Sequence, residues 1–93
     1  MTLSKKSVAV ITGAGSGIGR ALALQFAKEG IGGIAIADFN ETGLDETFAM
    51  VEKTGAKVSK HLIDVSKLEQ VQRLSEEVLA EHGRVTHLIN NAG

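Results

Sequence analysis

Four short apolar runs alternate with three longer amphipathic segments along the chain. The runs cover residues 8–11, 34–37, 57–63 and 85–89. The first two are continuously apolar, which is typical of strands covered on both faces of a parallel sheet. The third is more polar at its start, and this polarity favours a strand at the edge of the sheet.

The segments between the runs repeat apolar residues at helical spacing. The first helix is expected to run from about Ser16 to Glu29. The positions predicted to face inward are Ile18, Ala21, Leu22 and Phe26 in the first helix, Leu44, Phe48 and Val51 in the second, and Leu68, Val71, Leu74 and Val78 in the third. Charged residues such as Arg20 and Lys28 are expected on solvated helix faces.

Capping residues mark where these helices begin and end. Asn40 is the expected N-cap of the second helix, because its short side chain can accept a hydrogen bond from a free backbone N–H. Ser66 and Glu69 have the spacing of a capping box for the third helix. A glycine follows the expected end of each helix, namely Gly30, Gly55 and Gly83. Gly43 weakens the start of the second helix by up to about 1 kcal/mol relative to alanine.

The order of these elements is strand-helix-strand-helix-strand-helix-strand, with no linker or repeat between them. This pattern predicts an α/β fold, a partial Rossmann doubly wound parallel sheet with strand order 3-2-1-4. Two helices should cover one face of the sheet and the third helix the other. Ligands of such sheets bind where the strand order reverses, at the carboxyl ends of the first and fourth strands.

A glycine-rich bend, Thr12-Gly13-Ala14-Gly15-Ser16-Gly17-Ile18-Gly19, joins the first strand to the first helix. The first N–H groups of a helix have no partner within it, and the helix dipole makes that end partly positive. Glycines let a phosphate approach the backbone without meeting a Cβ atom. The bend is therefore interpreted as a cradle for the diphosphate of a dinucleotide.

The spacing of the glycines resembles that of a known family. The common G-x-G-x-x-G fingerprint is absent, whereas T-G-x-x-x-G-I-G over residues 12–19 is similar to the cofactor-binding motif of short-chain dehydrogenases/reductases. The last residues, Asn90-Asn91-Ala92-Gly93, match that family's second signature, N-N-A-G. The resemblance covers the whole chain and implies that residues 1–93 are the NAD-binding Rossmann portion of a family domain.

Asp38 predicts the choice of cofactor. It ends the second apolar run, 19 residues after Gly19, where the ribose-binding acid of dinucleotide folds is expected. A carboxylate accepts hydrogen bonds from the hydroxyls of the adenosine ribose but repels the 2′-phosphate of NADP. No Lys or Arg stands at Ser16, Phe39 or Asn40 to compensate. NAD is therefore expected in preference to NADP; the alternative is that Asp38 merely starts a turn.

Further contacts follow from the resemblance alone. It implies that Asp64 holds the adenine amino group and that the backbone N–H of Val65 meets a ring nitrogen, unless Asp64 only starts a turn. It also implies that the two asparagines tie the fourth strand to neighbouring backbone. The predicted cofactor-binding residues are Gly13, Gly15, Ser16, Gly17, Ile18, Gly19, Asp38, Asp64, Val65, Asn90, Ala92 and Gly93.

The resemblance also implies a reaction, hydride transfer between nicotinamide and an alcohol or carbonyl carbon. In the family a serine, a tyrosine and a lysine beyond N-N-A-G carry the catalysis, and this chain has no tyrosine. No catalytic residue is therefore assigned. The 93-residue chain is expected to be inactive alone and to meet an alcohol or ketone substrate only in a full-length form.

Composition limits the classes of partner and ligand that are expected. The formal net charge is −1, which gives no electrostatic case for nucleic acid or an anionic membrane surface. Cysteine is absent, and the spacings of His61, His82 and His87 fit no zinc pattern, so no metal site is predicted. No apolar segment has the roughly 20 residues of a membrane helix. A cytoplasmic protein is expected, with possible association through the open edge of the fourth strand.

Two other functions compete with the oxidoreductase interpretation. One is a dinucleotide-binding or interaction module without catalysis. The other is part of an S-adenosylmethionine-dependent methyltransferase, because Gly13, Gly15 and Gly17 also fit the G-x-G-x-G loop of that class. The methyltransferase class usually places an acid just before the first glycine, where this chain has Ile11-Thr12.

Overall fold

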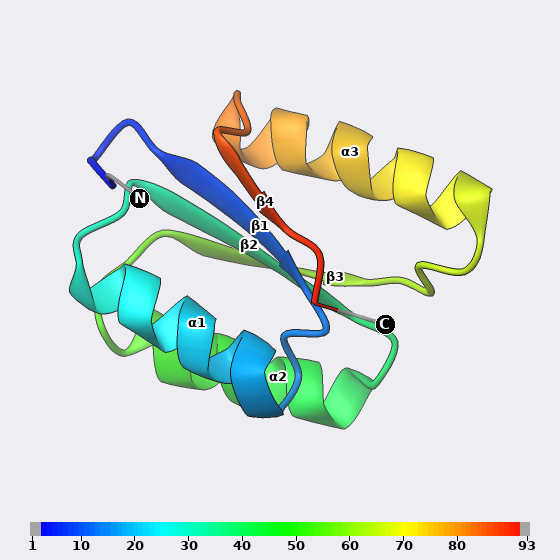
Figure 1. The fold of residues 1–93 in the computed structure, drawn as a ribbon, viewed down its shortest axis with the longest axis horizontal. Helices are drawn as coiled ribbons and strands as arrows, with labels where there is room; N and C mark the ends of the chain where they lie inside the picture. Colours follow the sequence, from blue (N-terminus) through cyan, green and yellow to red (C-terminus); the bar gives the residue numbers. More distant parts are fainter. Residues whose placement is uncertain (1–2, 92–93) are drawn as a thin grey trace.

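Four strands and three helices alternate along residues 3–91, the part of the chain that the computed structural model describes. In chain order they are β1 (Val8–Thr12), α1 (Gly17–Lys28), β2 (Gly33–Asp38), α2 (Glu41–Glu52), β3 (Val58–Leu62), α3 (Leu68–His82) and β4 (His87–Ile89). The strands form one parallel sheet in the order β3-β2-β1-β4. Helices α1 and α2 cover one face and α3 the other (Figure 1). The predicted fold is confirmed.

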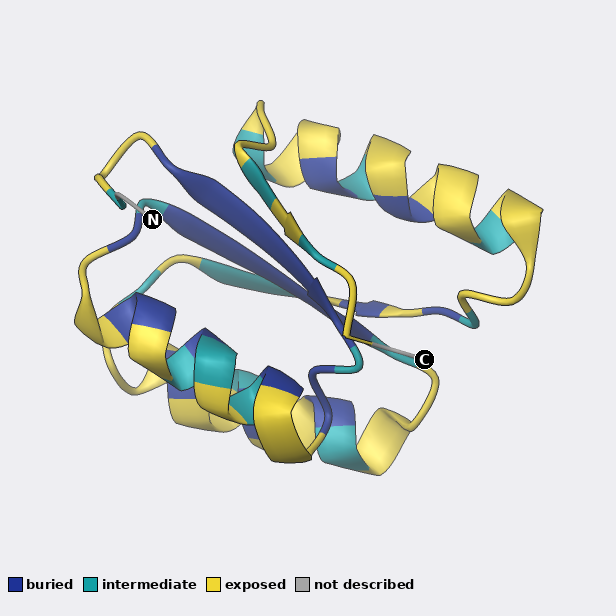
Figure 2. Cartoon of the chain, viewed as in Figure 1, coloured by how far each residue is buried: buried dark blue, intermediate teal, exposed yellow. Residues whose placement is uncertain are grey.

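The core lies on both faces of the two central strands, which Figure 2 shows as buried along almost their whole length. Side chains of a strand point alternately to the two faces. Facing α1 and α2, the buried cluster contains Ala9, Ile11, Ile34 and Ile36 from the strands, with Ala23, Phe26, Leu44 and Val51 from the helices. Facing α3, the buried cluster is Val10, Ala35, Ala37, Ile63, Leu74 and Val78. This alternation explains why both central strands are continuously apolar.

Helix α1 buries Phe26 and partly buries Leu22 against the core as predicted, but not Ile18 or Ala21. Its buried residues are Gly19, Ala23, Phe26 and Ala27, whereas Ile18 is 71% exposed and Ala21 is exposed. The reason is the close approach of the helix start to the preceding turn, where a methyl group on Gly19 would overlap the Gly13 carbonyl. Small residues therefore face the sheet in the first turns, and the larger Ile18 turns outward.

Helix α3 is buried only in its middle and later turns. Leu74 and Val78 are inside as predicted, but Leu68 is 70% exposed and Val71 is 38% exposed. Within residues 3–91, no second helix lies beside α3 on this face. The first turn of α3 consequently lacks an apolar neighbour to pack against.

The predicted helix ends are partly correct. The Asn40 side chain caps α2 by accepting the Gly43 N–H at 3.0 Å, and Gly83 ends α3 in the left-handed conformation. The capping box of α3 is wrong. Lys67 is the N-cap, without a side-chain capping bond, because the Ser66 hydroxyl donates to the Asp64 carboxylate instead.

None of the helices between residues 3 and 91 has the length and apolar character needed to span a bilayer.

Candidate functional site

A cleft of about 500 Å³ opens at the carboxyl ends of β1, β2 and β3. It lies at the edge of the sheet where the strand order reverses, with β2 on one side of β1 and β4 on the other, the position at which open α/β sheets bind ligands. Its lining residues are Gly13, Gly15, Ser16, Gly17, Ile18, Asp38, Phe39, Asn40, Ile63, Asp64, Val65, Ser66 and Asn91. Segments that are far apart in sequence thus meet at one site.

The glycine turn forms the wall between β1 and α1. Gly13 and Gly17 have positive φ angles of 64° and 56°, which side-chain-bearing residues rarely adopt. Ser16 is the N-cap of α1 but makes no side-chain capping bond. The first N–H groups of α1, which have no partner within a helix, therefore receive no side-chain cap from Ser16. Gly19 does not line the cleft and acts instead in the packing of α1 against the turn.

Asp38 faces this turn from the end of β2. One carboxylate oxygen accepts the Gly15 N–H at 2.7 Å, and the other accepts the Asn40 N–H at 3.0 Å. A Cβ atom on Gly15 would lie 2.8 Å from the carboxylate oxygen Oδ2 of Asp38, so a larger residue does not fit there. Two backbone donors thus fix the carboxylate beside the glycine turn.

A second carboxylate, that of Asp64, lies at the end of β3. Its Oδ1 atom accepts the Ser66 hydroxyl at 2.7 Å and the Ser66 N–H at 2.9 Å. These bonds, the hydroxyl first, lower the pKa of Asp64 below its ordinary value. Asp64 does start a turn, and it also lines the cleft together with Val65. None of the described lining residues is a lysine or an arginine.

The two asparagines hold β4 to the end of β1. The Thr12 hydroxyl donates to the Asn90 side-chain oxygen at 3.1 Å, so Asn90 faces β1 and not the cleft. Asn91 reaches the cleft and donates its side-chain N–H to the Gly13 carbonyl at 3.2 Å. The predicted contacts of Ala92 and Gly93 lie outside the described residues.

Several lining residues were not predicted as site residues. Phe39 and Asn40 follow β2, and Ile63 and Ser66 follow β3. Phe39 is 78% exposed, although an aromatic ring next to a buried strand would ordinarily be assigned to the core. Their signal in the sequence is position alone, since residues just after parallel strands gather at one edge of the sheet.

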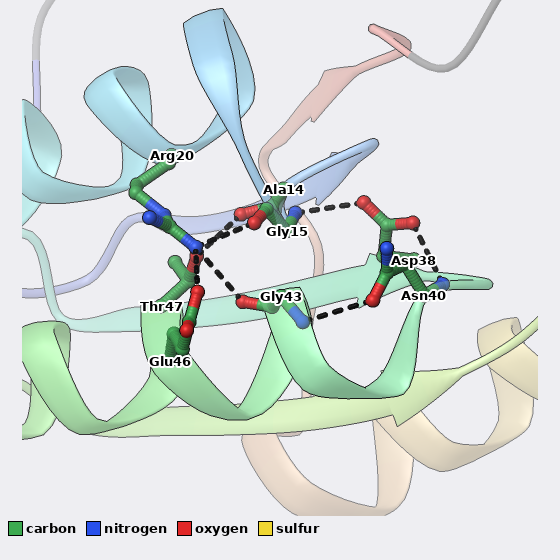
Figure 3. A network of polar contacts seen from close by, with 8 residues as sticks. All are labelled: Ala14, Gly15, Arg20, Asp38, Asn40, Gly43, Glu46 and Thr47. Carbon is green, nitrogen blue, oxygen red and sulfur yellow. Dashed lines mark hydrogen bonds and ion pairs between the residues drawn. The ribbon is translucent and has the colours of Figure 1, made fainter.

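Arg20 is the other residue that sequence reasoning missed. Its expected place on a solvated face is wrong, because its side chain is only 26% exposed. The guanidinium donates to the Gly15 carbonyl at 2.6 Å, to the Thr47 hydroxyl at 2.8 Å and to the Gly43 carbonyl at 3.2 Å (Figure 3). Arg20 therefore ties the glycine turn to α2.

The histidines lie away from the cleft. His61 is buried between β3 and α3, where its ring bonds the Ser59 hydroxyl and the Glu77 carboxylate, each at 2.7 Å. His82 contacts the same hydroxyl at 2.8 Å. Within residues 3–91 no three histidine or acidic side chains form a group suited to a metal ion.

Comparison with known proteins places this arrangement in a family. The chain matches the family model described as short chain dehydrogenase over residues 7–93. It is 46% identical over 87 residues to epidermal retinol dehydrogenase 2 of Homo sapiens, covering 92% of this chain and 28% of that relative. It is 43% identical over 93 residues to estradiol 17-beta-dehydrogenase 11 of Rattus norvegicus, covering 96% of this chain and 31% of the relative.

A solved structure supports the same family assignment. The fold matches that of NAD⁺-bound xylitol dehydrogenase with a TM-score of 0.91 and 36% identity, covering 95% of this chain and 34% of the other. The chain thus spans about a third of the length of these three proteins. The family match removes the methyltransferase alternative. The chain belongs to the short-chain dehydrogenase family.

Proposed function

We propose that this chain is the NAD-binding part of a short-chain oxidoreductase that transfers hydride between nicotinamide and an alcohol or carbonyl carbon. The observation that carries the proposal is the pairing of the glycine turn with the Asp38 carboxylate across one cleft. The structure of a related xylitol dehydrogenase contains NAD⁺, which supports the same cofactor here.

The lining of the cleft offers groups for the diphosphate and the adenosine half of a dinucleotide. The N–H groups at Ser16, Gly17 and Ile18 would hold the diphosphate, because the start of a helix attracts anions. Asp38 would accept hydrogen bonds from the adenosine ribose, and the Asp64-Val65 segment would contact adenine. The fit depends on Gly15, since a Cβ atom there would occupy the space beside the Asp38 carboxylate. Bound NAD would supply the hydride acceptor or donor.

The same carboxylate supports NAD over NADP. A 2′-phosphate would meet the negative charge of Asp38, and like charges placed together across an interface cost several kcal/mol. The described lining offers no lysine or arginine to offset that charge. Arg20 lies behind the glycine turn, where carbonyl oxygens, the Thr47 hydroxyl and Glu46 already engage its guanidinium.

The substrate is proposed only as a class. Relatives named as retinol and estradiol dehydrogenases support an alcohol or ketone, which the full-length protein would receive beside the nicotinamide. A cytoplasmic location remains a prediction from composition.

The test is a fluorescence titration of the protein with NADH and with NADPH. The native protein should bind NADH more tightly than NADPH. Asp38→Asn should weaken NADH binding by about ten- to a hundredfold, because a hydrogen bond to a charged group contributes about 1.5–3 kcal/mol. It should also narrow the difference between the two cofactors.

Asp45→Asn is the matched control. Asp45 is an exposed acid of α2 that pairs with Lys60 at 2.8 Å, away from the cleft. This variant should bind both cofactors as the native protein does. NADPH binding equal to or tighter than NADH binding would contradict the cofactor preference. Binding of NADH without turnover of any alcohol or ketone by the full-length product would favour the non-catalytic module.

A further inference from the structure

The backbone of Gly15 is held on two sides by charged side chains. Its N–H donates to Asp38 at 2.7 Å, and its carbonyl accepts from the Arg20 guanidinium at 2.6 Å (Figure 3). We propose that Arg20 is a positioning residue, which fixes the backbone of Gly15 so that Asp38 is correctly placed for the ribose of NAD. This inference rests on the proposed function.

Arg20 is itself fixed by a buried hydroxyl. Its Nε–H donates to the Thr47 oxygen at 2.8 Å, and the Thr47 hydroxyl donates in turn to the Ala14 carbonyl at 2.8 Å. Thr47 is fully buried, so both roles of its hydroxyl are satisfied within the protein. These two hydrogen bonds, from Arg20 to Thr47 and from Thr47 to Ala14, therefore hold the guanidinium against the glycine turn.

Helix α2 comes close enough to the turn to make this contact effective. A Cβ atom on Gly43 would overlap the Gly15 carbonyl, so the two backbones are in direct contact. Arg20 bridges the carbonyls of Gly15 and Gly43 and also pairs with Glu46 at 3.0 Å. Because α2 begins three residues after Asp38, the position of its first turn also sets the position of that carboxylate.

The planar guanidinium is what this geometry requires. Arginine presents several donors in a fixed fork, whereas lysine is a flexible point charge. Lysine at position 20 would keep the positive charge but could not donate to Thr47 and to two carbonyls together. The pair Arg20→Lys and Arg20→Met therefore separates positioning from a simple electrostatic effect on the anionic cofactor.

The experiment measures NADH affinity and the amide hydrogen exchange of Gly15 in Arg20→Lys, Arg20→Met and Thr47→Val. Both Arg20 variants should lose about tenfold in NADH affinity, and their Gly15 amide should exchange faster in the cofactor-free protein. The NADH-to-NADPH preference should fall in parallel. Thr47→Val, which keeps the arginine, should give a smaller loss in the same direction.

Arg73→Met is the matched control, since Arg73 also donates from a helix to a backbone carbonyl, that of Leu62 at 2.7 Å, but on α3. It should leave NADH affinity unchanged. If Arg20→Lys binds NADH like the native protein with unchanged Gly15 exchange, the positioning role is overturned while the proposed function stands. If the native protein binds no NADH, the proposed function fails, whatever the exchange data show.

Discussion

The two faces of the sheet differ in how fully they are covered. Helices α1 and α2 pack side by side on one face and bury Phe26, Leu44 and Val51 against the central strands. On the other face α3 is alone among the described residues and buries only Leu74 and Val78. Large apolar side chains that remain exposed on α3 and β4 are Leu68, Val71, Leu79 and Leu88.

The two faces also differ in how they hold the lining of the cleft. The turn and the carboxylate that we assign to the cofactor are braced by the covered face, through the Arg20 and Thr47 contacts with α2. The part of the cleft lining that follows β3 is held instead by local hydrogen bonds, such as that from the Ser66 hydroxyl to the Asp64 carboxylate. The more open face contributes less to the site and leaves apolar surface for further contacts.

The largest expected effect is a difference in unfolding free energy between two leucine-to-alanine variants, one on each face of the sheet. Leu44, on α2, is 2% exposed and Leu79, on α3, is 51% exposed. Leu44→Ala should lower the free energy of unfolding by about 2–5 kcal/mol, and Leu79→Ala by less than about 0.5 kcal/mol. Urea denaturation measures both. Equal losses would show that the two faces are covered alike.

An intermediate effect is expected at the edge of the sheet. β4 pairs with β1 on one side only in the described structure, and Leu88 is 67% exposed. Open apolar edges promote association. Leu88→Glu should therefore reduce self-association of residues 1–93, as measured by analytical ultracentrifugation, with little change in unfolding free energy. A native chain that is monomeric at all concentrations would contradict this.

The smallest effect concerns pH and the contact between β3 and α3. Burial, and then nearby Lys57 and His61, lower the pKa of His82 below its ordinary 6.5, against an opposing effect of Glu81. The unfolded chain then binds more protons than the folded one as pH falls below about 6.5, so stability should decrease there. His82→Gln should flatten that slope in thermal unfolding between pH 7 and pH 5. An unchanged slope would show that other titrating groups cause the loss of stability at low pH.

Much of the fold was predictable because its signals are local. Continuous apolar runs, the Asn40 cap and the glycines after each helix each depend on a few neighbouring residues. The order of the strands followed from the alternation of strands and helices together with the handedness of the crossovers. Gly17 and Asp38 were assigned from the glycine pattern and its spacing, and Asp64 from the family resemblance; all three line one cleft.

The incorrect predictions concern residues whose position depends on contacts with segments far away in the sequence. Ile18 fits the helical period of α1, yet contact between Gly19 and the Gly13 backbone turns it outward. Gly43 looked like a weakness of α2 but is the residue that lets the helix touch Gly15. Arg20 carries no sequence signal of its own, because its role depends on where α2 lies.

The central claim is that a dinucleotide binds between the glycine turn and the Asp38 carboxylate. The most direct measurement is a map of backbone amide chemical shifts as NADH is added to ¹⁵N-labelled protein. The account predicts the largest changes at residues 13–19, near Asp38 and at residues 64–65, with none around Ser59 and His82. Absent changes, or changes centred on the contact between β3 and α3, would contradict it.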